Sequence, residues 1–585
     1  MNETVDLVVA GSGAGGLSAG VTAAVLGLSV VVLEKEPVFG GTTAWSGGWL
    51  WVPRNGFALA AGIREHLHEP RRYLEHEVGA AFEAQRIDAY LAHAPRMVEF
   101  FQAHTSVAFI EGNGIPDFHT ASPGAAQGGR SVGSASFDAR ALGPHVRNLR
   151  PPLDLMSING MGIASGAELR HYFDALHRWS SFRYVARRMT ALARDLAFHG
   201  RSMRLVNGNA LAARLAKSAF DRGVALRLDS PVVRLLLEEG RVVGAVYRHG
   251  GKEHEVRARR GVVLACGGFP HDPERIRRLF PHAPSGREHY SAAPPGNTGD
   301  GLRLGESAGG IVEDRLHASG AWAPVSRVPR ADGRTTNYPH LIERAKPGII
   351  AVTRAGRRFV DEAGSYYDFV DALITAAPAG RPVEGWLVCD HRFIRRYGLG
   401  AVRPAPFRLG RWLKSGYLIR AHDIAGVARA CGIDASELSR TIDRYNADAR
   451  QGRDTAFGRG DMPFDRLHGD PHWTPNPCVA PIERPPYYAV KVVPGSLGTF
   501  AGLRTDATGR VVDRTGAPIA GLYACGNDMC SIMGGRYPSG GITLGPAMTF
   551  GYLAAHHAAG CVPDAGAQRA TRPAATPPCA GGATG

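Results

Sequence analysis

A tyrosine and a glycine four residues apart carry the clearest chemical signal in the chain. Tyr537 and Gly541 lie in the segment RYPSGG, residues 536–541, where proline and glycines prevent a helix from beginning before Ile542. Tyr537 is therefore expected on a turn, and the backbone N–H groups after it are free to face a ligand. A phenol and an N–H group at this spacing can converge on one oxygen and stabilise an enolate. The alternative, a core tyrosine bonded to backbone, fits a glycine-flanked turn poorly.

A second pattern opens the chain and is typical of a dinucleotide site. Residues 7–34 read as an apolar strand, the turn GSGAGG, an Ala- and Leu-rich helix and a second apolar strand that ends in Glu34. Gly11 permits the tight turn, Gly13 leaves room for a pyrophosphate, and Gly16 lets the helix pack on the strand. Glu34 can accept hydrogen bonds from the adenosine ribose. Because strand, turn, helix and acidic residue agree, we prefer this interpretation to a structural turn.

The stretch after the second strand favours FAD over NAD. Residues 40–48, GGTTAWSGG, follow directly and place small and hydroxyl side chains where a cofactor longer than NAD would continue. For an isolated segment, a flexible Gly/Ser loop would be the alternative.

Composition bounds the class of protein. The chain has 585 residues, 44% of them hydrophobic and 21% charged, which predicts two or three globular units. The formal net charge of +15 is dispersed and Arg-rich, without basic runs alternating with aromatics, so nucleic-acid binding is not expected. An anionic substrate or an acidic electron acceptor stays open. The eight cysteines form neither a CxxC pair nor a CxxCH motif, so no metal or haem site is expected.

Neither an export signal nor a membrane anchor is predicted. The sequence starts MNETVDLVVAG, without a basic and apolar leader, and no apolar run approaches the roughly twenty residues that span a bilayer. Scattered cysteines favour a reducing compartment. We therefore expect a cytoplasmic protein without a transmembrane segment.

The secondary-structure patterns suggest a nucleotide-binding framework with an insertion. They predict helices at 55–106 and 172–219, a loop at 110–143, an antiparallel meander at 225–257 and a strand at 261–269. Residues 282–485 differ in character, with Trp/Pro-rich and Arg-rich stretches, before strands and turns return from Tyr487. The last residues, 561–585, are rich in Ala, Pro, Gly and Thr and are predicted to be disordered.

Together these motifs resemble the flavoproteins of the fumarate reductase and succinate dehydrogenase superfamily, over most of residues 4–558. Residues 40–48 are similar to its GG-x-T-x-x-S-GG element, and residues 531–552, SIMGGRYPSGGITLGPAMTFGY, resemble the signature of the 3-ketosteroid Δ1-dehydrogenases. The resemblance implies an α/β fold. A Rossmann-like, glutathione-reductase-like FAD-binding domain with an antiparallel meander would comprise 1–281 and 486–560, and an inserted α+β catalytic domain would comprise 282–485.

The resemblance implies an FAD-dependent oxidoreductase that acts on a CH–CH group. A base would take the proton alpha to a ketone, most plausibly of a 3-ketosteroid, while the beta carbon gives hydride to flavin N5. A quinone or other acceptor would then reoxidise the flavin. One alternative is a fumarate-reductase-like ene reductase of an unsaturated carboxylate, which would start from Arg344 and Arg536. Others are a 3-ketosteroid Δ4-(5α)-dehydrogenase, because residues 537–539 read Tyr-x-Ser, and a non-catalytic flavin protein.

The family's catalytic roles are carried over residue by residue. Tyr537 and Gly541 would bind the ketone oxygen, and the helix from Thr543 would aim its N-terminus at the flavin pyrimidine ring. Tyr338, shortly before a Pro-Gly turn and a strand, would be the base, with a surface-loop tyrosine as the alternative. The family's relay tyrosine is absent from PDFH, residues 116–119, where His119 would relay the proton instead, unless it is structural.

The resemblance also assigns contacts to non-covalently bound FAD. Asp528 or Asn527 would accept from ribityl hydroxyls, and Val232 and Val233 would contact adenine through the backbone. The residues expected around FAD are Gly11, Gly13, Ala14, Gly15, Gly16, Glu34, Lys35, Gly41, Thr42, Thr43, Ser46, Gly47, Gly48, Val233, Ala265, Gly267, Asn527, Asp528, Gly541, Thr543 and Leu544. Those expected around the substrate are Phe118, Tyr537, Ser539 and Gly540. Residues 357–367, RRFVDEAGSYY, match a family element expected to support the pocket.

Overall fold

The strand, turn and helix predicted at the start of the chain are present in the structure. A computed structural model describes residues 3–164, 166–406 and 408–561, so the predicted disordered tail lies outside it except for Cys561. In it β1 (Glu3–Ala10) leads through the glycine-rich turn to α1 (Ala14–Val25) and β2 (Val30–Leu33). The last four residues of β1 and all of β2 are buried, as expected of parallel strands covered on both faces.

These strands belong to an eight-stranded mixed sheet. Its order is β10-β2-β1-β13-β12-β11, with β23 beside β13 and β22 beside β23. The pairs that β1 forms with β2 and β13 are parallel, whereas β11, β12 and β13 form the antiparallel meander that the sequence predicted. The further strands are β10 (Ala225–Arg227), β11 (Val232–Glu238), β12 (Arg241–His249), β13 (Lys252–Leu264), β22 (Arg510–Val512) and β23 (Pro518–Ala524).

One expectation for this sheet was wrong. We predicted separate strands at 254–257 and 261–269, but β13 is continuous from Lys252 to Leu264. Gly261 makes this continuity possible, because its φ of +135° lets the strand pass β23 closely. A Cβ atom there would lie 2.3 Å from the Gly521 carbonyl oxygen.

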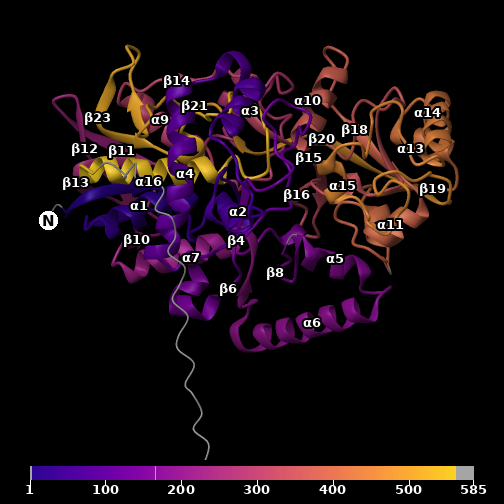
Figure 1. Cartoon of the computed structure of the whole chain (residues 1–585), viewed down its shortest axis with the longest axis horizontal. Helices are drawn as coiled ribbons and strands as arrows, with labels where there is room; N and C mark the ends of the chain where they lie inside the picture. The colour runs from indigo at the N-terminus through magenta and orange to yellow at the C-terminus, as the bar shows by residue number, and fades with distance from the viewer. Residues whose placement is uncertain (1–2, 165, 407, 562–585) are drawn as a thin grey trace, which may run out of the picture.

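The two ends of the described chain meet beside the glycine-rich turn. Helix α16 (Leu544–Ala559) packs against α1, and Figure 1 shows this yellow helix beside the indigo first helix. The Ser18 hydroxyl donates to the Met548 carbonyl at 2.8 Å, and Gly551 approaches the Gly15 carbonyl so closely that a Cβ atom would lie 2.5 Å from it. Helix α7 (Asn207–Asp221) packs on α1 as well.

The segments between β2 and β10 are mainly helical, as predicted. They contain α2 (Gly56–Ala60), α3 (His68–Val78), α4 (Ala84–His104), α5 (Ala167–Asp174), α6 (Trp179–His199) and α7. The predicted loop at 110–143 instead contains short strands: β3 (Trp49–Trp51), β5 (Ser131–Ser134) and β4 (Phe109–Glu111) form a three-stranded sheet, and β6 (Phe137–Asp138) pairs with β9 (Arg204–Leu205). Strands this short leave little periodicity for a sequence pattern to detect.

A second sheet has the order β16-β15-β20-β18-β17, with β19 also paired to β20. Its strands are β15 (Gly320–Pro329), β16 (Thr335–Pro339), β17 (Ile349–Thr353), β18 (Gly385–Cys389), β19 (Ile419–Ala421) and β20 (Tyr487–Thr499). Strand β20 corrects our boundary at 485/486, because its backbone hydrogen bonds join it to β15, β18 and β19. We retain the division into 1–281, 282–485 and 486–560 as a proposal, with the second boundary moved beyond Thr499.

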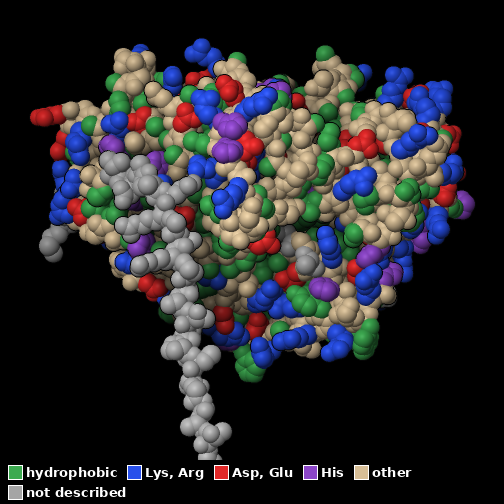
Figure 2. All heavy atoms as spheres, viewed as in Figure 1, with side chains coloured by type: hydrophobic (Ala, Val, Ile, Leu, Met, Phe, Trp, Pro, Cys, Tyr) green, Lys and Arg blue, Asp and Glu red, His purple; other side chains and the backbone are tan. Residues whose placement is uncertain are grey.

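The remaining elements surround these sheets. They are α8 (Pro273–Leu279), α9 (Asp300–Ser307), α10 (Tyr366–Ala376), α11 (His391–Tyr397), α12 (Gly410–Lys414), α13 (Ile424–Cys431), α14 (Ala435–Ala449), α15 (Pro463–His468), and the short pairs β7 (Ser157–Ile158) with β8 (Met161–Gly162) and β14 (Val312–Glu313) with β21 (Gly502–Leu503). In the described part of the chain, every helix is too short or too polar to cross a bilayer, and the predicted cytoplasmic location stays a prediction. Figure 2 shows Lys and Arg side chains spread over the visible face among Asp and Glu.

Replacing Gly261 with alanine tests the close passage of β13 and β23. We expect Gly261→Ala to lower the free energy of unfolding by more than about 2 kcal/mol, because it adds a steric clash to an unfavourable φ. Gly251→Ala is the matched control, since Gly251 also has a positive φ of +79° but would place its Cβ atom in open space. Denaturant unfolding of both variants measures the difference; equal losses would contradict the proposed clash.

Candidate active site

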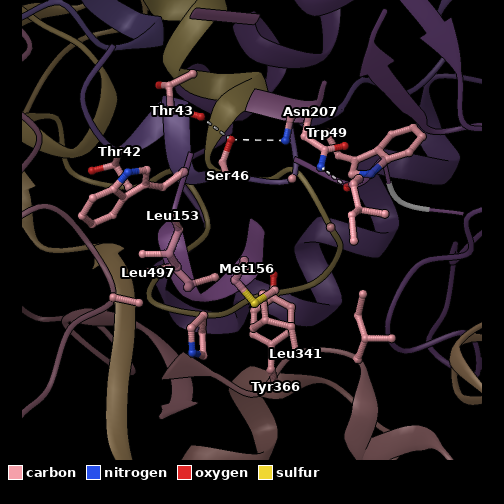
Figure 3. A pocket seen from close by; sticks show the side chains of 18 of the residues that line it. Thr42, Thr43, Ser46, Trp49, Leu153, Met156, Asn207, Leu341, Tyr366 and Leu497 are labelled. Atoms are coloured by element: carbon pink, nitrogen blue, oxygen red, sulfur yellow. Dashed lines mark hydrogen bonds between the residues drawn. The ribbon is translucent and has the colours of Figure 1, made fainter. Parts of the chain in front are cut away.

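A large cavity lies against the glycine-rich turn and reaches the second sheet. Its volume of about 1770 Å³ exceeds the roughly 300–1,000 Å³ typical of a pocket for one small ligand. Figure 3 shows Thr42, Thr43 and Ser46 on one side of it and Met156, Leu341 and Tyr366 on the other. The cavity therefore has room for a long cofactor and a second molecule.

The N-terminus of α1 faces one end of the cavity and suits an anion. Its N-cap residue, Gly13, offers no side-chain cap, and the Ala14 N–H donates to the Thr43 hydroxyl at 2.9 Å. A Cβ atom on Gly13 would meet only the Thr43 hydroxyl, at 3.8 Å, so the backbone is open to the cavity. Uncapped N–H groups and the helix dipole favour a phosphate here, which fits the pyrophosphate of FAD.

The acidic residue at the end of β2 is held in place by the turn itself. One Glu34 carboxylate oxygen accepts from the Ser12 N–H at 3.0 Å and from the Ser12 hydroxyl at 2.5 Å, and the other accepts from the Glu36 N–H. Glu34 is 8% exposed and lines the cavity. The carboxylate is thus fixed where a ribose could bind, as the sequence predicted.

Hydroxyl residues continue the wall beyond the turn. Thr42 and Thr43 lie in a 3-10 turn, Thr42–Trp45, and the Ser46 hydroxyl donates to the Thr43 carbonyl at 2.8 Å. The Asn297 side chain donates to the Thr42 hydroxyl at 2.9 Å and to the Gly267 carbonyl at 3.0 Å. These bonds join three distant segments of the chain around one groove.

All but three of the residues predicted to contact FAD line this cavity. Gly16 lies outside because it serves packing: a Cβ atom there would lie 2.1 Å from the Gly11 carbonyl oxygen. Val233 is 37% exposed, and Val232 lines the cavity in its place. The adenine contact at Val233 therefore stays a prediction.

Asp528 is the third residue outside the cavity. Its buried carboxylate accepts from the N–H groups of Cys266 and Gly268, and burial raises the pKa of Asp528 to about 6. Asn527 lines the cavity instead. Of the two residues that we predicted for the ribityl chain, Asn527 is therefore the one that reaches the cavity, and its contact with FAD stays a prediction. Asp528 instead holds the backbone that follows β13.

A second helix N-terminus faces the cavity from the other direction. Helix α16 begins after Thr543, which makes no side-chain cap, and both Thr543 and Leu544 line the cavity. The positive end of the helix dipole can stabilise negative charge on a ligand placed there. This is the position at which the sequence predicted the flavin pyrimidine ring.

Tyr537 lies in the non-helical connection before α16 rather than on the turn that we predicted, since residues 536–538 have no regular structure and the turns lie on either side of them. It forms part of an aromatic cluster. It is 4% exposed and lines the cavity. Its ring stacks on Phe118 with centroids 5.7 Å apart and lies 5.1 Å from Tyr366 at 75°. Burial raises the pKa of Tyr537, while hydrogen bonds with the Tyr366 and Thr543 side chains lower it. The phenol is therefore a protonated donor at neutral pH.

Gly541 is fixed by its carbonyl group, which leaves its N–H group available. The carbonyl accepts from the N–H groups of Trp51 and Gly545 at 3.1 and 3.0 Å. Its φ is +97°, and a Cβ atom would lie 2.6 Å from the Trp51 nitrogen, so only glycine fits. Within the described ranges the Gly541 N–H has no acceptor, and Gly541 lines the cavity beside Tyr537.

Tyr366 is the residue whose importance the sequence did not reveal. It opens α10 directly after the N-cap Ser365, lines the cavity, and has its ring centre 5.1 Å from that of Tyr537. Burial, and then the neighbouring Tyr537, raise the pKa of Tyr366 well above its usual value. Its neighbour Tyr367 instead donates to the Gly535 carbonyl at 2.6 Å. The sequence Ser365-Tyr366-Tyr367 alone does not show which tyrosine faces the cavity, because this depends on the residue at which α10 begins.

The predicted base, Tyr338, reaches the same cavity from the second sheet. It lies on β16 opposite Ser326, and its ring contacts His340 with centroids 5.1 Å apart. Burial raises the pKa of Tyr338 well above its usual value. Ring contacts join Tyr537 to Tyr366 rather than to Tyr338. The role of Tyr338 as base stays a prediction.

His119 is not brought to the cavity. Its Nδ1 is bonded to Glu77 at 2.6 Å and its Nε2 to Asp368 at 2.7 Å. Burial opposes the charged imidazolium, but the hydrogen bonds to Asp368 and Glu77 outweigh it and raise the pKa of His119 to about 10. A ring with both nitrogens bonded to carboxylates suits an ion bridge between α3 and α10, and its raised pKa favours the charged form at neutral pH. The relay role of His119 stays a prediction, which this placement does not support.

Of the four residues predicted to surround the substrate, three line the cavity and one does not. Phe118 and Gly540 line the cavity with Tyr537, and the Phe118 N–H donates to the Pro538 carbonyl at 3.0 Å. Ser539 is 1% exposed and lies outside the cavity. The structure therefore gives Ser539 no place against a substrate, which removes the geometric support for the Tyr-x-Ser alternative.

Comparisons with known proteins agree with this geometry. Residues 6–544 match the family model described as FAD binding domain. The chain is 38% identical to a 4-oxocyclohex-2-ene-1-carboxylate 5-dehydrogenase of Sinomonas cyclohexanicum, covering 94% of each chain, and 38% identical to a 3-oxosteroid 1-dehydrogenase of Mycobacterium tuberculosis, covering 95% of this chain and 98% of that protein. It is similar to the crystal structure of 3-ketosteroid delta1-dehydrogenase from Sterolibacterium denitrificans in complex with 1,4-androstadiene-3,17-dione. That likeness has a TM-score of 0.88 and 36% identity, and it covers 96% of this chain and 100% of that one.

The ion bridge at His119 predicts a pH dependence of stability. The pKa of His119 is raised in the folded protein, so its stabilising effect is complete below the unfolded pKa of about 6.5 and is lost as pH rises towards about 10. We expect wild type to exceed His119→Gln in free energy of unfolding by more at pH 6 than at pH 9.5, measured with denaturant. A difference that stays constant or grows with pH would exclude a charged bridge.

Proposed function

Because the chain belongs to the FAD binding domain family, we propose that it oxidises a cyclic ketone at the bond alpha,beta to the carbonyl, with a 3-ketosteroid as substrate and the Δ1 bond as the site of oxidation. The chain is an FAD-dependent oxidoreductase acting on CH–CH groups. Its similarity to 3-oxosteroid 1-dehydrogenases over most of both chains supports the substrate class.

One observation carries the proposal: the phenol of Tyr537 and the free backbone N–H of Gly541 belong to two residues that both line the cavity, next to the N-terminus of α16. Tyr537 is a protonated donor, and the Gly541 N–H lacks an acceptor within the part of the chain described. Both groups can donate to one ketone oxygen, where negative charge develops as the alpha proton leaves. Each donor to such an oxyanion is worth about 3 kcal/mol.

We propose Tyr366 as the base. The centre of its ring lies 5.1 Å from that of Tyr537, which places its phenol beside the proposed ketone position. Burial holds the pKa of Tyr366 above its usual value, so its own proton must first leave to solvent through the cavity, and the phenolate then takes the alpha proton. When bound, FAD accepts the hydride from the beta carbon at N5. An external acceptor, for which we propose a quinone, must then remove the electrons.

The geometry gives less support to reduction of an unsaturated carboxylate. Arg344 is buried and donates to the backbone carbonyls of His340, Glu362 and Gly364, so its guanidinium is not offered to a ligand. Arg536, the other residue named for that role, does not line the cavity. The wall around Tyr537 is aromatic instead.

A smaller cyclic ketone is the second candidate substrate. The chain is as similar to a 4-oxocyclohex-2-ene-1-carboxylate 5-dehydrogenase as to a 3-oxosteroid 1-dehydrogenase. Either substrate would place its ring ketone at the Tyr537 hydroxyl and the Gly541 N–H. The two substrates differ in the length of the molecule on the side away from the ketone.

Removing the Tyr537 hydroxyl tests the oxyanion role. We expect Tyr537→Phe to keep its yellow cofactor but to lower the rate of flavin reduction by androst-4-ene-3,17-dione by about 10² to 10³, because one donor is lost. Tyr445→Phe is the matched control, since the buried Tyr445 hydroxyl has no hydrogen-bond partner in the described residues and lies outside the cavity. Stopped-flow reduction at an unchanged rate would remove Tyr537 from this role.

The two candidate bases are separated by a second pair of variants. Tyr366→Phe should slow flavin reduction by about 10² or more, as loss of a general base does, whereas Tyr338→Phe should retain most of the rate. The loss in Tyr366→Phe should be accompanied by loss of alpha-proton exchange with deuterated water. If Tyr338→Phe abolishes exchange and Tyr366→Phe does not, the base is Tyr338.

A further inference from the structure

The cavity does not end at the aromatic cluster but continues to a basic region. A series of ring contacts leads away from Tyr537 through Phe118. The ring centroids of Phe118 and Phe464 are 4.4 Å apart, and those of Phe464 and His468 are 4.8 Å apart. All four residues line the cavity. Lys346 also lines the cavity, and burial, followed by the charge of Lys346, lowers the pKa of His468.

Lys346 is a buried cation with few partners. It follows the 3-10 turn Glu343–Ala345 before β17 and is only 8% exposed. Its ammonium group donates to the Gly469 carbonyl at 2.9 Å and lies 5.2 Å from the centre of the Phe173 ring. Within the described ranges it makes no ion pair with a carboxylate. An ammonium has three donors, and burying it without an opposite charge is costly.

The acidic groups nearby are already engaged. Asp470 accepts from the Tyr397 hydroxyl at 2.6 Å, and its other cationic neighbour is Arg396 at 3.5 Å. Asp174 is paired with that same arginine at 2.9 Å. Arg170, which is exposed at the cavity, adds a further positive charge without an ion pair in the described chain. Burial lowers the pKa of Lys346 to about 8, and the negative charge of Asp470 only partly opposes this. In the described residues no carboxylate lies within ion-pair distance of the ammonium, which can therefore still pair with one.

We propose that Lys346 binds a carboxylate of the substrate, so that the substrate class is a cyclic ketone that carries an acidic group remote from the carbonyl. This inference rests on the proposed function, since it assumes that the ketone lies at Tyr537. The carboxylate would take the two free donors of the ammonium and give it an ion-pair partner, with Arg170 attracting it at the rim.

The test uses two matched pairs of ligands with the FAD-loaded enzyme. The long pair is 3-oxoandrost-4-ene-17β-carboxylate and its methyl ester, and the short pair is 4-oxocyclohexanecarboxylate and its methyl ester. We expect wild type to have a lower KM for the acid than for the ester in the pair whose length matches the cavity. Lys346→Met should raise the KM for that acid by about tenfold to a hundredfold, as expected for a lost charged hydrogen bond, and leave the ester unchanged.

Controls separate this inference from folding and from the proposed function. Lys217→Met removes a lysine that pairs with Asp221 on the surface of α7 and should change neither KM. Lys346→Gln, which keeps a donor without the charge, serves where Lys346→Met loses FAD or thermal stability. Equal effects on acid and ester, or none, would overturn the carboxylate site. If wild type oxidises none of the four ketones, the proposed function fails; the carboxylate site is then judged by binding of the acids, seen as a change in the flavin spectrum that Lys346→Met abolishes.

Discussion

The active site depends on how the backbone at Gly541 is fixed. Its carbonyl accepts from the Trp51 N–H in β3 and from the Gly545 N–H in the first turn of α16. Those two bonds force a positive φ and leave no room for a side chain. They also set the direction of the Gly541 N–H, and with it the distance to the phenol of Tyr537. In the proposed function, this fixed N–H group and the phenol would both donate to one ketone oxygen.

The same arrangement explains why the ends of the chain must meet. The N-termini of α1 and α16 both face the cavity, one towards the expected pyrophosphate and one towards the expected flavin ring. Gly15 and Gly551 let the two helices approach closely, and the Ser18 hydroxyl ties α1 to α16. Packing of these helices therefore aligns two positive dipole ends on one elongated, electron-rich cofactor. The second sheet then supplies the wall against which a substrate rests.

Much of this could be predicted from the sequence where the signal is local. The glycine-rich turn, Glu34 and the segment around Tyr537 are short motifs whose chemistry follows from neighbours in the chain, and all three line the cavity. Tyr366 and Lys346 could not be identified in this way, because their proposed roles depend on residues more than a hundred positions away. The carboxylate partners of His119 were likewise hidden, because Glu77 and Asp368 lie 42 and 249 positions from it in the chain. Strand β20 shows that an apolar strand pattern does not identify the sheet it joins.

If a ring ketone binds at Tyr537 and Gly541 and is oxidised by the FAD of this chain, anaerobic mixing of the purified yellow enzyme with androst-4-ene-3,17-dione should bleach the flavin absorbance. One equivalent of the 1,4-diene-3-ketone should form for each flavin reduced. A flavin that stays oxidised with every ring ketone but, once reduced chemically, is reoxidised by fumarate would rule out this reaction.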